Sequence, residues 1–503
     1  MINLGNKREL FFDDHLINTE KTTAKKQLHK LRRTRDVIMK LDKPWEGNTC
    51  GYFSIFFAEG KWRMYYRTGN SERYRPQVAY AESSDAINWV RPSLGIVEFD
   101  GSRDNNLILG TEMLKELGFK AFDNLYVFYD EHPMCPADER YKMLCMYCGN
   151  GALICLVSSD GIHFRKSHIV TRDGEFDSQN LAFYSKTYGK YFCYYRGEHD
   201  PNPQTHIMDK SFTDKVANEL ADPEKMLMRA PGAGDKAFMR DVRVIESEDF
   251  HNWSEQKQIN CTGFDLQFYT SGIMPYPREE SIFFGISMRY TERKAWTPTY
   301  DELCGREARL HRIKTSQLRA GLAITDGVLL ITRDGYNFTK FDEAILPPPP
   351  ESPDAYVYGD GFAVPMILEI PSEVEGADNE YMIMVVDGYR SNLGYDCLRK
   401  YTIRLDGFVS LHAGCTEERI VTKEFTYDGD ALYANIATSA RGYAYFTLKC
   451  DGESYESYEI FGDSVNKRIH FINDEAIKKL SGKVVTLEVR ALDCDLYAIK
   501  FDK

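Results

Sequence analysis

The sequence predicts an all-β protein, a five-bladed β-propeller followed by a C-terminal β-sandwich. Three observations favour this fold: a turn motif that occurs four times, aromatic-rich strands upstream of each copy, and a change to short alternating strands after about residue 407. With 503 residues the chain is too long for one ordinary compact core, and regular self-similarity is typical of repeat architectures. We therefore expect a propeller over residues 1–406 and an accessory sandwich over residues 407–503.

The repeated turn has the pattern Ser or Thr, any residue, Asp, three further residues, then Trp or Phe. Its copies cover residues 83–89, 158–164, 247–253 and 332–338, so the Asp recurs every 75 to 89 residues. A carboxylate in such a turn can accept hydrogen bonds from the backbone ahead of it, and the aromatic ring can pack between sheets. We interpret these four aspartates as structural.

Strand segments fill the space between the turns. One aromatic-rich strand precedes each turn, at residues 61–66, 141–147, 190–195 and 281–286, and further strands lie upstream, for example at 52–57 and 125–129. This order of strands is that of one propeller blade. A fifth, degenerate unit follows the proline run 347–350, with strands near 361–366 and 380–386.

An open propeller would leave a bare sheet edge, so we expect residues 9–12 to add the strand that closes the ring. Three insertions, at residues 106–120, 214–233 and 292–320, are candidate walls of a pocket. Beyond residue 407, alternating segments at 431–436, 442–448, 484–489 and 496–501 predict an antiparallel sandwich.

Composition excludes several classes of protein. The net charge of −13 argues against a nucleic-acid partner, and no apolar stretch is long enough to span a membrane. No signal-peptide pattern opens the sequence, which predicts a cytoplasmic location. Twelve scattered cysteines, with Cys145 and Cys148 on opposite faces of one strand, indicate reduced thiols rather than a metal or redox site. The sequence contains no phosphate-binding P-loop motif, no zinc-protease motif and no nucleophile-elbow motif of α/β-hydrolases.

Five blades with this turn and a trailing sandwich resemble the five-bladed glycosidases of the invertase/levanase and arabinanase type, glycoside hydrolase families 32, 43 and 68. The segments at residues 10–16, 44–46 and 404–411 are similar to those of a bacterial glycosyl-hydrolase-like group. The resemblance spans roughly residues 8–500 and implies catalytic carboxylates on the inner strands of the first three blades. The sequence lacks the three acid-bearing motifs of invertases, so invertase activity itself is not expected.

Cleavage of a glycosidic bond requires one protonated carboxyl group and one ionised carboxylate. Since the first strand of each blade lines the channel, the candidates are the acids at the starts of these strands: Glu46, Asp123, Asp177, Asp265 and Asp360. We interpret Asp123, Asp177 and Glu46 as the catalytic set and Asp360 as a binding residue. The alternative interpretation is that equivalent aspartates only cap turns.

The neighbours of these acids support a sugar site. Asn124 and Gln179 carry amides that could bind hydroxyl groups, and Trp45 beside Glu46 could form an aromatic wall that raises the pKa of this acid. Glu198, on the second strand of blade three, is the rival acid.

An arginine also recurs at the end of the second strand in four blades, at Arg67, Arg196, Arg289 and Arg390. Arg67, Arg196 and Arg289 are expected to bind substrate, either by orienting the carboxylates or by clamping an acidic sugar. Bridging between blades is the alternative role.

Together these features predict a glycoside hydrolase that acts on a small oligosaccharide, with a furanoside or an acidic sugar among the candidate substrates. A phosphate-dependent phosphorylase and a non-catalytic sugar-binding propeller are the alternatives. No cofactor is expected, although the architecture admits a structural calcium ion. The expected partner is a small carbohydrate, with neither nucleic acid nor membrane, and the sequence does not predict an oligomeric state.

Overall fold

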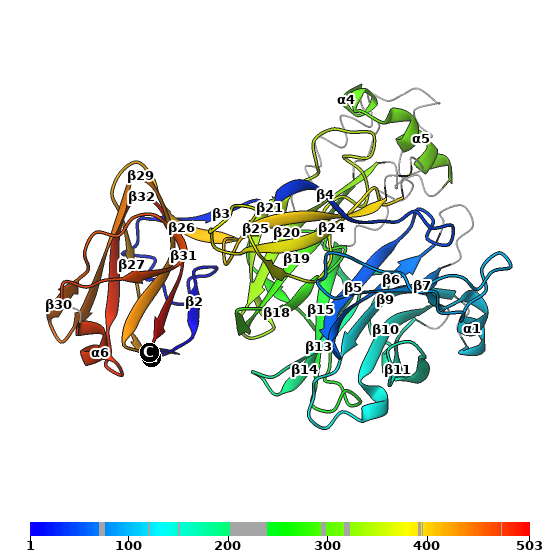
Figure 1. Ribbon diagram of the computed structural model, residues 1–503, viewed down its shortest axis with the longest axis horizontal. Coiled ribbons are helices and arrows are strands. Elements are labelled where there is room, and N and C mark those ends of the chain that lie inside the picture. Colours follow the sequence, from blue (N-terminus) through cyan, green and yellow to red (C-terminus); the bar gives the residue numbers. More distant parts are fainter. Residues whose placement is uncertain are drawn as a thin grey trace.

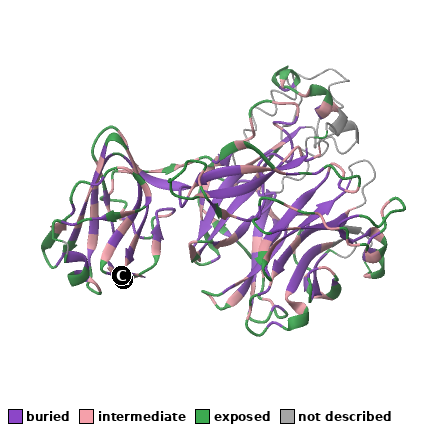
Figure 2. Ribbon diagram, in the orientation of Figure 1, coloured by how far each residue is buried: buried purple, intermediate pink, exposed green. Residues whose placement is uncertain are grey.

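The computed structural model confirms a five-bladed β-propeller, joined to a second β-domain (Figure 1). The structure describes residues 1–69, 76–118, 121–148, 151–201, 239–292, 298–315, 322–390, 394, 396–473 and 475–503. The strands of both bodies are buried along most of their length, whereas the loops are exposed (Figure 2).

The first three blades are four-stranded antiparallel sheets. Blade one contains β5 (Gly51–Ala58), β6 (Lys61–Thr68), β7 (Gln77–Ser83) and β8 (Leu107–Leu109). Blade two contains β9 (Ala121–Tyr129), β10 (Tyr141–Cys148), β11 (Ala152–Ser158) and β12 (Arg165–Thr171). Blade three contains β13 (Leu181–Ser185), β14 (Lys190–His199), β15 (Met239–Ser247) and β16 (Lys257–Gln258).

The last two blades have five strands each. Blade four contains β17 (Asn260–Cys261), β18 (Ile273–Tyr276), β19 (Glu279–Glu292), β20 (Ala323–Thr332) and β21 (Asn337–Leu346). Blade five contains β22 (Phe362–Ala363), β23 (Leu368–Ile370), β24 (Glu380–Asp387), β25 (Cys397–Arg404) and β4 (Arg32–Lys40).

Hydrophobic clusters between neighbouring blades hold the ring together. The strand β11, with the sequence Ala-Leu-Ile-Cys-Leu-Val-Ser, is buried at every position because both faces of its blade pack against other blades. The clusters around Leu125, Tyr191, Phe283, Tyr381 and Met382 each join two consecutive blades, the last one closing the circle from blade five to blade one.

The repeated turns behave as expected. In each turn, one carboxylate oxygen of the Asp accepts hydrogen bonds from two backbone N–H groups, as Asp160 does from Ile162 and His163 at 2.8 and 2.9 Å. The next residue has a positive φ in all four copies, at Ala86, Gly161, Phe250 and Gly335. A Cβ added to Gly161 would lie 2.5 Å from the hydroxyl of Tyr65 on blade one, and one added to Gly335 would lie 2.5 Å from Phe192 on blade three, so these two turns pack closely against the preceding blade.

The prediction for ring closure was wrong. The strand β4 closes the ring by pairing with β25, while β2 (Arg8–Leu10) pairs with β32 (Thr486–Asp502) of the other domain. The apolar run after β2 is needed elsewhere: Phe12 packs against Tyr276 and Phe408 at ring distances of 5.4 and 6.2 Å. The charged strand β4 suits an outer edge, because charged side chains discourage pairing with other chains.

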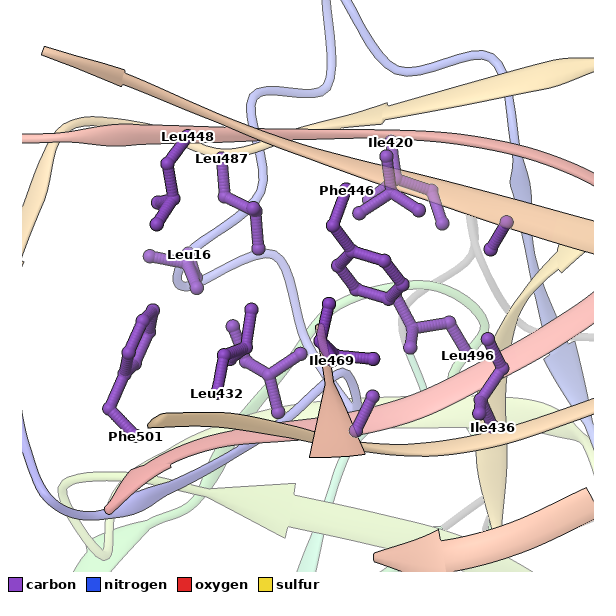
Figure 3. Close-up of a cluster of buried hydrophobic side chains, with 14 of the residues drawn as sticks. Leu16, Ile420, Leu432, Ile436, Phe446, Leu448, Ile469, Leu487, Leu496 and Phe501 are labelled. Atoms are coloured by element: carbon purple, nitrogen blue, oxygen red, sulfur yellow. The ribbon is translucent and has the colours of Figure 1, made fainter. Parts of the chain in front are cut away.

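Both ends of the chain build the second domain. Its main sheet contains β3 (Lys25–Leu28), β26 (Val409–Ala413), β29 (Ala431–Cys450), β30 (Glu453–Glu456), β32, β2, β27 (Glu418–Val421) and β31 (Asp463–Ile469). The strand β1 (Ile2–Gly5) pairs with β28 (Phe425–Tyr427). Leu16 lies among Leu432, Leu487 and Phe501 in the core (Figure 3). The strands β1, β2 and β3 therefore pair with strands of this domain rather than with the propeller blades, and the domain bounds 1–406 and 407–503 stay a prediction.

Few helices occur in the described residues: α1 (Thr111–Glu116), η1 (Ala137–Glu139), α4 (Pro298–Glu302), α5 (Arg306–Thr315) and α6 (Ala476–Leu480). None of them could cross a bilayer, being too short and insufficiently apolar. The insertions at 106–120 and 292–320 contribute α1, α4 and α5, and the insertion at 214–233 lies outside the described residues. Every cysteine whose side chain is described is outside any disulfide.

Candidate active site

The inner strands of blades one and two are irregular near Asp123. In β9, Leu125 and Asp123 pair with consecutive residues of β10, so Asn124 forms a bulge with a φ of 54°. Tyr52, in a similar irregularity of β5, also has a φ of 54°, and Arg390 after β24 has a φ of 63°. Such values are costly for residues other than glycine, and they concentrate at functional sites. Bulges re-aim side chains, here at the ends of the inner strands.

Asp123 is anchored by a guanidinium from the neighbouring blade. Arg67, at the end of β6, donates a hydrogen bond to Asp123, and its side chain is only 3% exposed. Arg67 also donates to the carbonyl of Thr49 at 3.0 Å and to the hydroxyl of Tyr389 at 2.7 Å, and it lies 4.6 Å above the ring of Tyr52. These contacts fix the position of Asp123 between blades one and two.

Asp177, just before the first strand of blade three, is the more open acid. Its side chain is 48% exposed, its Oδ1 accepts a hydrogen bond from Asn124 Nδ2 at 3.1 Å, and its Oδ2 lies 3.6 Å from Arg196 Nη2. The backbone N–H of Asn124 also donates to Asp123 at 2.8 Å. Asn124 therefore connects the two predicted aspartates, and Asp177 presents an oriented carboxylate to solvent.

Glu198 shares a strand face with Arg196. The two residues are two positions apart on β14, so both side chains point to the same side of the blade. Burial raises the pKa of Glu198, and the negative charge of Glu175 raises it further, while Arg196 and Arg240 oppose this change. Glu198 therefore keeps its proton to a higher pH than an ordinary glutamate side chain does, as a general acid requires.

Buried tyrosines pack together beside Arg67 and Arg196. Tyr269 and Tyr358 meet edge to face at 5.3 Å, and the hydroxyl of Tyr52 lies 3.4 Å from that of Tyr269. Arg390 lies 5.5 Å above the rings of both Tyr358 and Tyr389. Burial raises the pKa of Tyr269, and the charge of Asp177 raises it further, so the Tyr269 hydroxyl stays neutral. Sequence reasoning missed this ring of tyrosines, because tyrosine is frequent throughout the chain.

Glu46 does not join this cluster, which corrects its predicted catalytic role. It is fully buried and accepts hydrogen bonds from Tyr66 at 2.7 Å and from the backbone of Lys43 at 2.8 Å, and it pairs with Arg91 at 2.9 Å. Trp45 donates to Asn106 at 2.7 Å instead of forming a pocket wall. A carboxylate enclosed in this way cannot touch a substrate, so the Trp-Glu pair supports blade one.

Three further candidates have structural contacts. Gln179 donates to the backbone carbonyl of Phe53 at 2.9 Å and is buried, so it links blades three and one. Arg289 pairs with Asp326 of its own blade, with Nε at 2.8 Å from Oδ1. Asp360 accepts a hydrogen bond from the backbone N–H of Val357 at 2.9 Å, as a turn cap does.

No group of three or more histidine, cysteine or acidic side chains in the described part of the chain could hold a metal ion. The structural calcium ion that the architecture admits therefore has no candidate ligand set among those residues.

The structure is thus a five-bladed propeller in which Asn124 joins the buried Asp123 to the exposed Asp177. No protein-family profile matches the sequence, and no curated protein matches it. Among solved structures, the chain is similar to one from glycoside hydrolase family 130 of mannoside phosphorylases, described as containing hydrolases that target β-1,2 mannosidic linkages in Candida mannan. The identity is 11%, the match covers 75% of this chain and 94% of the other, and the TM-score is 0.42.

It is also similar to a glycosyl hydrolase from Bacteroides ovatus, at 11% identity, 75% and 94% coverage and a TM-score of 0.40. A family 43 arabinoxylan arabinofuranohydrolase from Bacillus subtilis matches at 10% identity, 93% and 99% coverage and a TM-score of 0.36. Similarity at this level does not assign a function.

Proposed function

We propose that this protein is a glycoside hydrolase that acts on a small oligosaccharide at the mouth of the propeller channel. The observation that supports this proposal is the open carboxylate of Asp177, held between Asn124 and Arg196 with Glu198 on the same strand face as Arg196. Hydrolysis of a glycosidic bond needs two carboxyl groups in different protonation states, and these two acids occupy different environments.

In the proposed mechanism, Asp177 serves as the nucleophile or as the base that activates water. Glu198 gives its proton to the leaving oxygen, and its raised pKa favours this role. Asp123, fixed by Arg67, and the amide of Asn124 bind sugar hydroxyl groups beside the reacting carbon. The neutral hydroxyl group of Tyr269 donates a hydrogen bond to the bound sugar.

The arginines favour water over phosphate as the second substrate. Arg67 is engaged by Asp123, Thr49 and Tyr389, and Arg196 donates to the carbonyl of Glu175 at 3.1 Å and faces Asp177. These guanidinium groups thus face carboxylate and carbonyl oxygens of the protein. The same arrangement favours a neutral sugar over an acidic one.

The test compares the parent protein with Asp177→Asn and Glu198→Gln on a panel of aryl glycosides and furanoside oligosaccharides, with and without inorganic phosphate. We expect turnover without phosphate and a loss of about 10²- to 10⁴-fold in each variant. Asp138→Asn is the matched control, because Asp138 is an exposed acid in η1 that pairs with Arg165 of β12.

Three outcomes would contradict the proposal. Activity of Asp177→Asn equal to that of the parent protein would remove Asp177 from the mechanism. Turnover only in the presence of phosphate would identify a phosphorylase, and binding of sugars without turnover would identify a binding module.

A further inference from the structure

A polar cavity lies where the chain passes from blade three to blade four. Its volume is about 520 Å³, which is within the usual range for small-ligand sites. It is lined in part by His199, Asp241, Gln258, Asp265, Phe264 and Tyr336. We call it the rim pocket.

The His199 and Asp241 side chains of the rim pocket lie on the face of β14 and β15 opposite to the one that carries Glu198. Glu198 and His199 are consecutive on β14, and Glu198 lies opposite Arg240 in the sheet. Asp241 follows Arg240 on β15. Because neighbouring side chains of a strand point to opposite faces, His199 and Asp241 face away from the side that carries Glu198.

His199 connects two aspartates in the wall of the rim pocket. Its Nδ1 lies 3.0 Å from Asp241 and its Nε2 lies 3.1 Å from Asp265. Arg243 also donates to both oxygens of Asp241, at 2.7 and 2.8 Å. The hydrogen bond to Asp241 raises the pKa of His199. With His199 protonated, its charge and that of Arg243 balance the two carboxylates.

Lys340, the other cationic side chain that lines the pocket, is also paired with a carboxylate. Lys340 is buried and pairs with Asp342, and burial lowers the pKa of its ammonium group. The charges of the two cationic side chains that line the pocket, His199 and Lys340, are therefore balanced, and the nearby Lys257 ammonium lies 5.8 Å from the centre of the Tyr336 ring. An uncharged ligand with many hydroxyl groups fits this balance better.

Two exposed aromatic rings complete the pocket. Phe264 is 52% exposed and Tyr336 is 36% exposed, and both border the same cavity as Asp265 and the amide of Gln258. Flat aromatic surfaces accept the apolar faces of sugar rings, while carboxylate and amide groups bind pairs of hydroxyl groups. A purely structural His199 bridge would need neither the cavity nor the exposed rings.

We propose that the rim pocket binds an uncharged sugar unit. This inference goes beyond the proposed function, since it requires no catalysis at Asp177. The sugar unit belongs either to a distal part of the oligosaccharide substrate that is cleaved at the channel mouth or to a separate glycan.

The experiment uses the full chain carrying Asp177→Asn, so that no probe is consumed. Neutral methyl glycosides of mannose, galactose, glucose and arabinose are titrated by calorimetry, with glucuronate and inorganic phosphate as charged probes. We expect a neutral glycoside to bind with a dissociation constant on the order of 1 mM. Adding Phe264→Ala or Gln258→Ala should weaken this binding at least about tenfold, or about 1.4 kcal/mol.

Phe461→Ala is the matched control, because Phe461 is also an exposed ring, at 61%, and lies in the second domain. Both phenylalanines are exposed, so neither variant should disturb folding, which thermal unfolding checks. Equal binding by the Phe264 and Phe461 variants, no binding of any neutral glycoside, or a preference for glucuronate or phosphate would overturn the proposal.

A kinetic comparison on the otherwise unmodified protein separates the two sources of the sugar. If the sugar is a distal part of the substrate, Phe264→Ala raises KM for long oligosaccharides and leaves short aryl glycosides unchanged. If it is a separate glycan, KM stays the same while binding falls. Failure of the rim pocket leaves the effect of Asp177→Asn on turnover untouched, so the two proposals fail separately.

Discussion

Replacing Arg67 with methionine should destabilise the propeller strongly and identify the pair that fixes Asp123. The substitution keeps most of the length of the side chain but removes its charge. Arg67 is buried and donates to Asp123, to the carbonyl of Thr49 and to Tyr389. Removing one partner of such a buried ion pair leaves the other charge uncompensated, so we expect a loss of about 3 kcal/mol or more in the free energy of unfolding.

Tryptophan fluorescence during denaturation in urea is a suitable assay. All five tryptophans lie between residues 45 and 296, so the signal reports on the propeller and not on the second domain. Arg165→Met is the control: Arg165 forms an exposed pair with Asp138, and its loss should change stability by about 0.5 kcal/mol or less.

The double variant Arg67→Met/Asp123→Asn tests the cause. Because it removes both charges, it should lose less stability than the sum of the two single variants. A loss below about 1 kcal/mol in Arg67→Met, as for an exposed pair, or strict additivity in the double variant, would refute the reasoning.

Three further predictions follow from the same structure. Asn124→Gly should keep the stability of the parent protein, since glycine adopts a φ of 54° freely. It should lower turnover, because the hydrogen bond from Asn124 to Asp177 is lost. Asn124→Val should lower turnover and also lower the free energy of unfolding by about 1–3 kcal/mol in urea denaturation. Gly161→Ala should lower the melting temperature more than Gly189→Ala, because both positions have a positive φ but only a Cβ at Gly161 would meet Tyr65; equal losses would contradict the role given to the turn. The turnover rate should fall as pH rises through the raised pKa of Glu198, because only its protonated form donates, and Glu198→Gln should remove this alkaline limb of the pH profile; a limb that survives in the variant belongs to another group.

Features encoded within a few residues could be predicted from the sequence. The Asp of each repeated turn bonds to backbone groups two and three positions ahead, so the turn is a local structure and its spacing revealed the blades. The chain closure could not be read in this way. The apolar run after β2 suggested a buried strand in the ring, but its side chains are buried at the seam with the second domain.

Among the site residues, too, those with a local sequence signal could be predicted and those that depend on distant segments could not. Asp123, Asp177, Arg67 and Arg196 were predicted from their recurrent positions at strand ends, and the structure brings them together. Glu46 carried a similar local signal, yet Arg91, from a distant segment, encloses it. The partners of His199 come from two other segments, so nothing in its local sequence marked the rim pocket.

Chemical rescue of Asp177→Ala tests the central claim most directly. If Asp177 is the nucleophile or the base at the channel mouth, the variant should be nearly inactive on an activated aryl glycoside, and added azide should restore turnover and form a glycosyl azide. Turnover by the unrescued variant at the rate of the parent protein, or a folded variant that azide fails to rescue, would contradict the account.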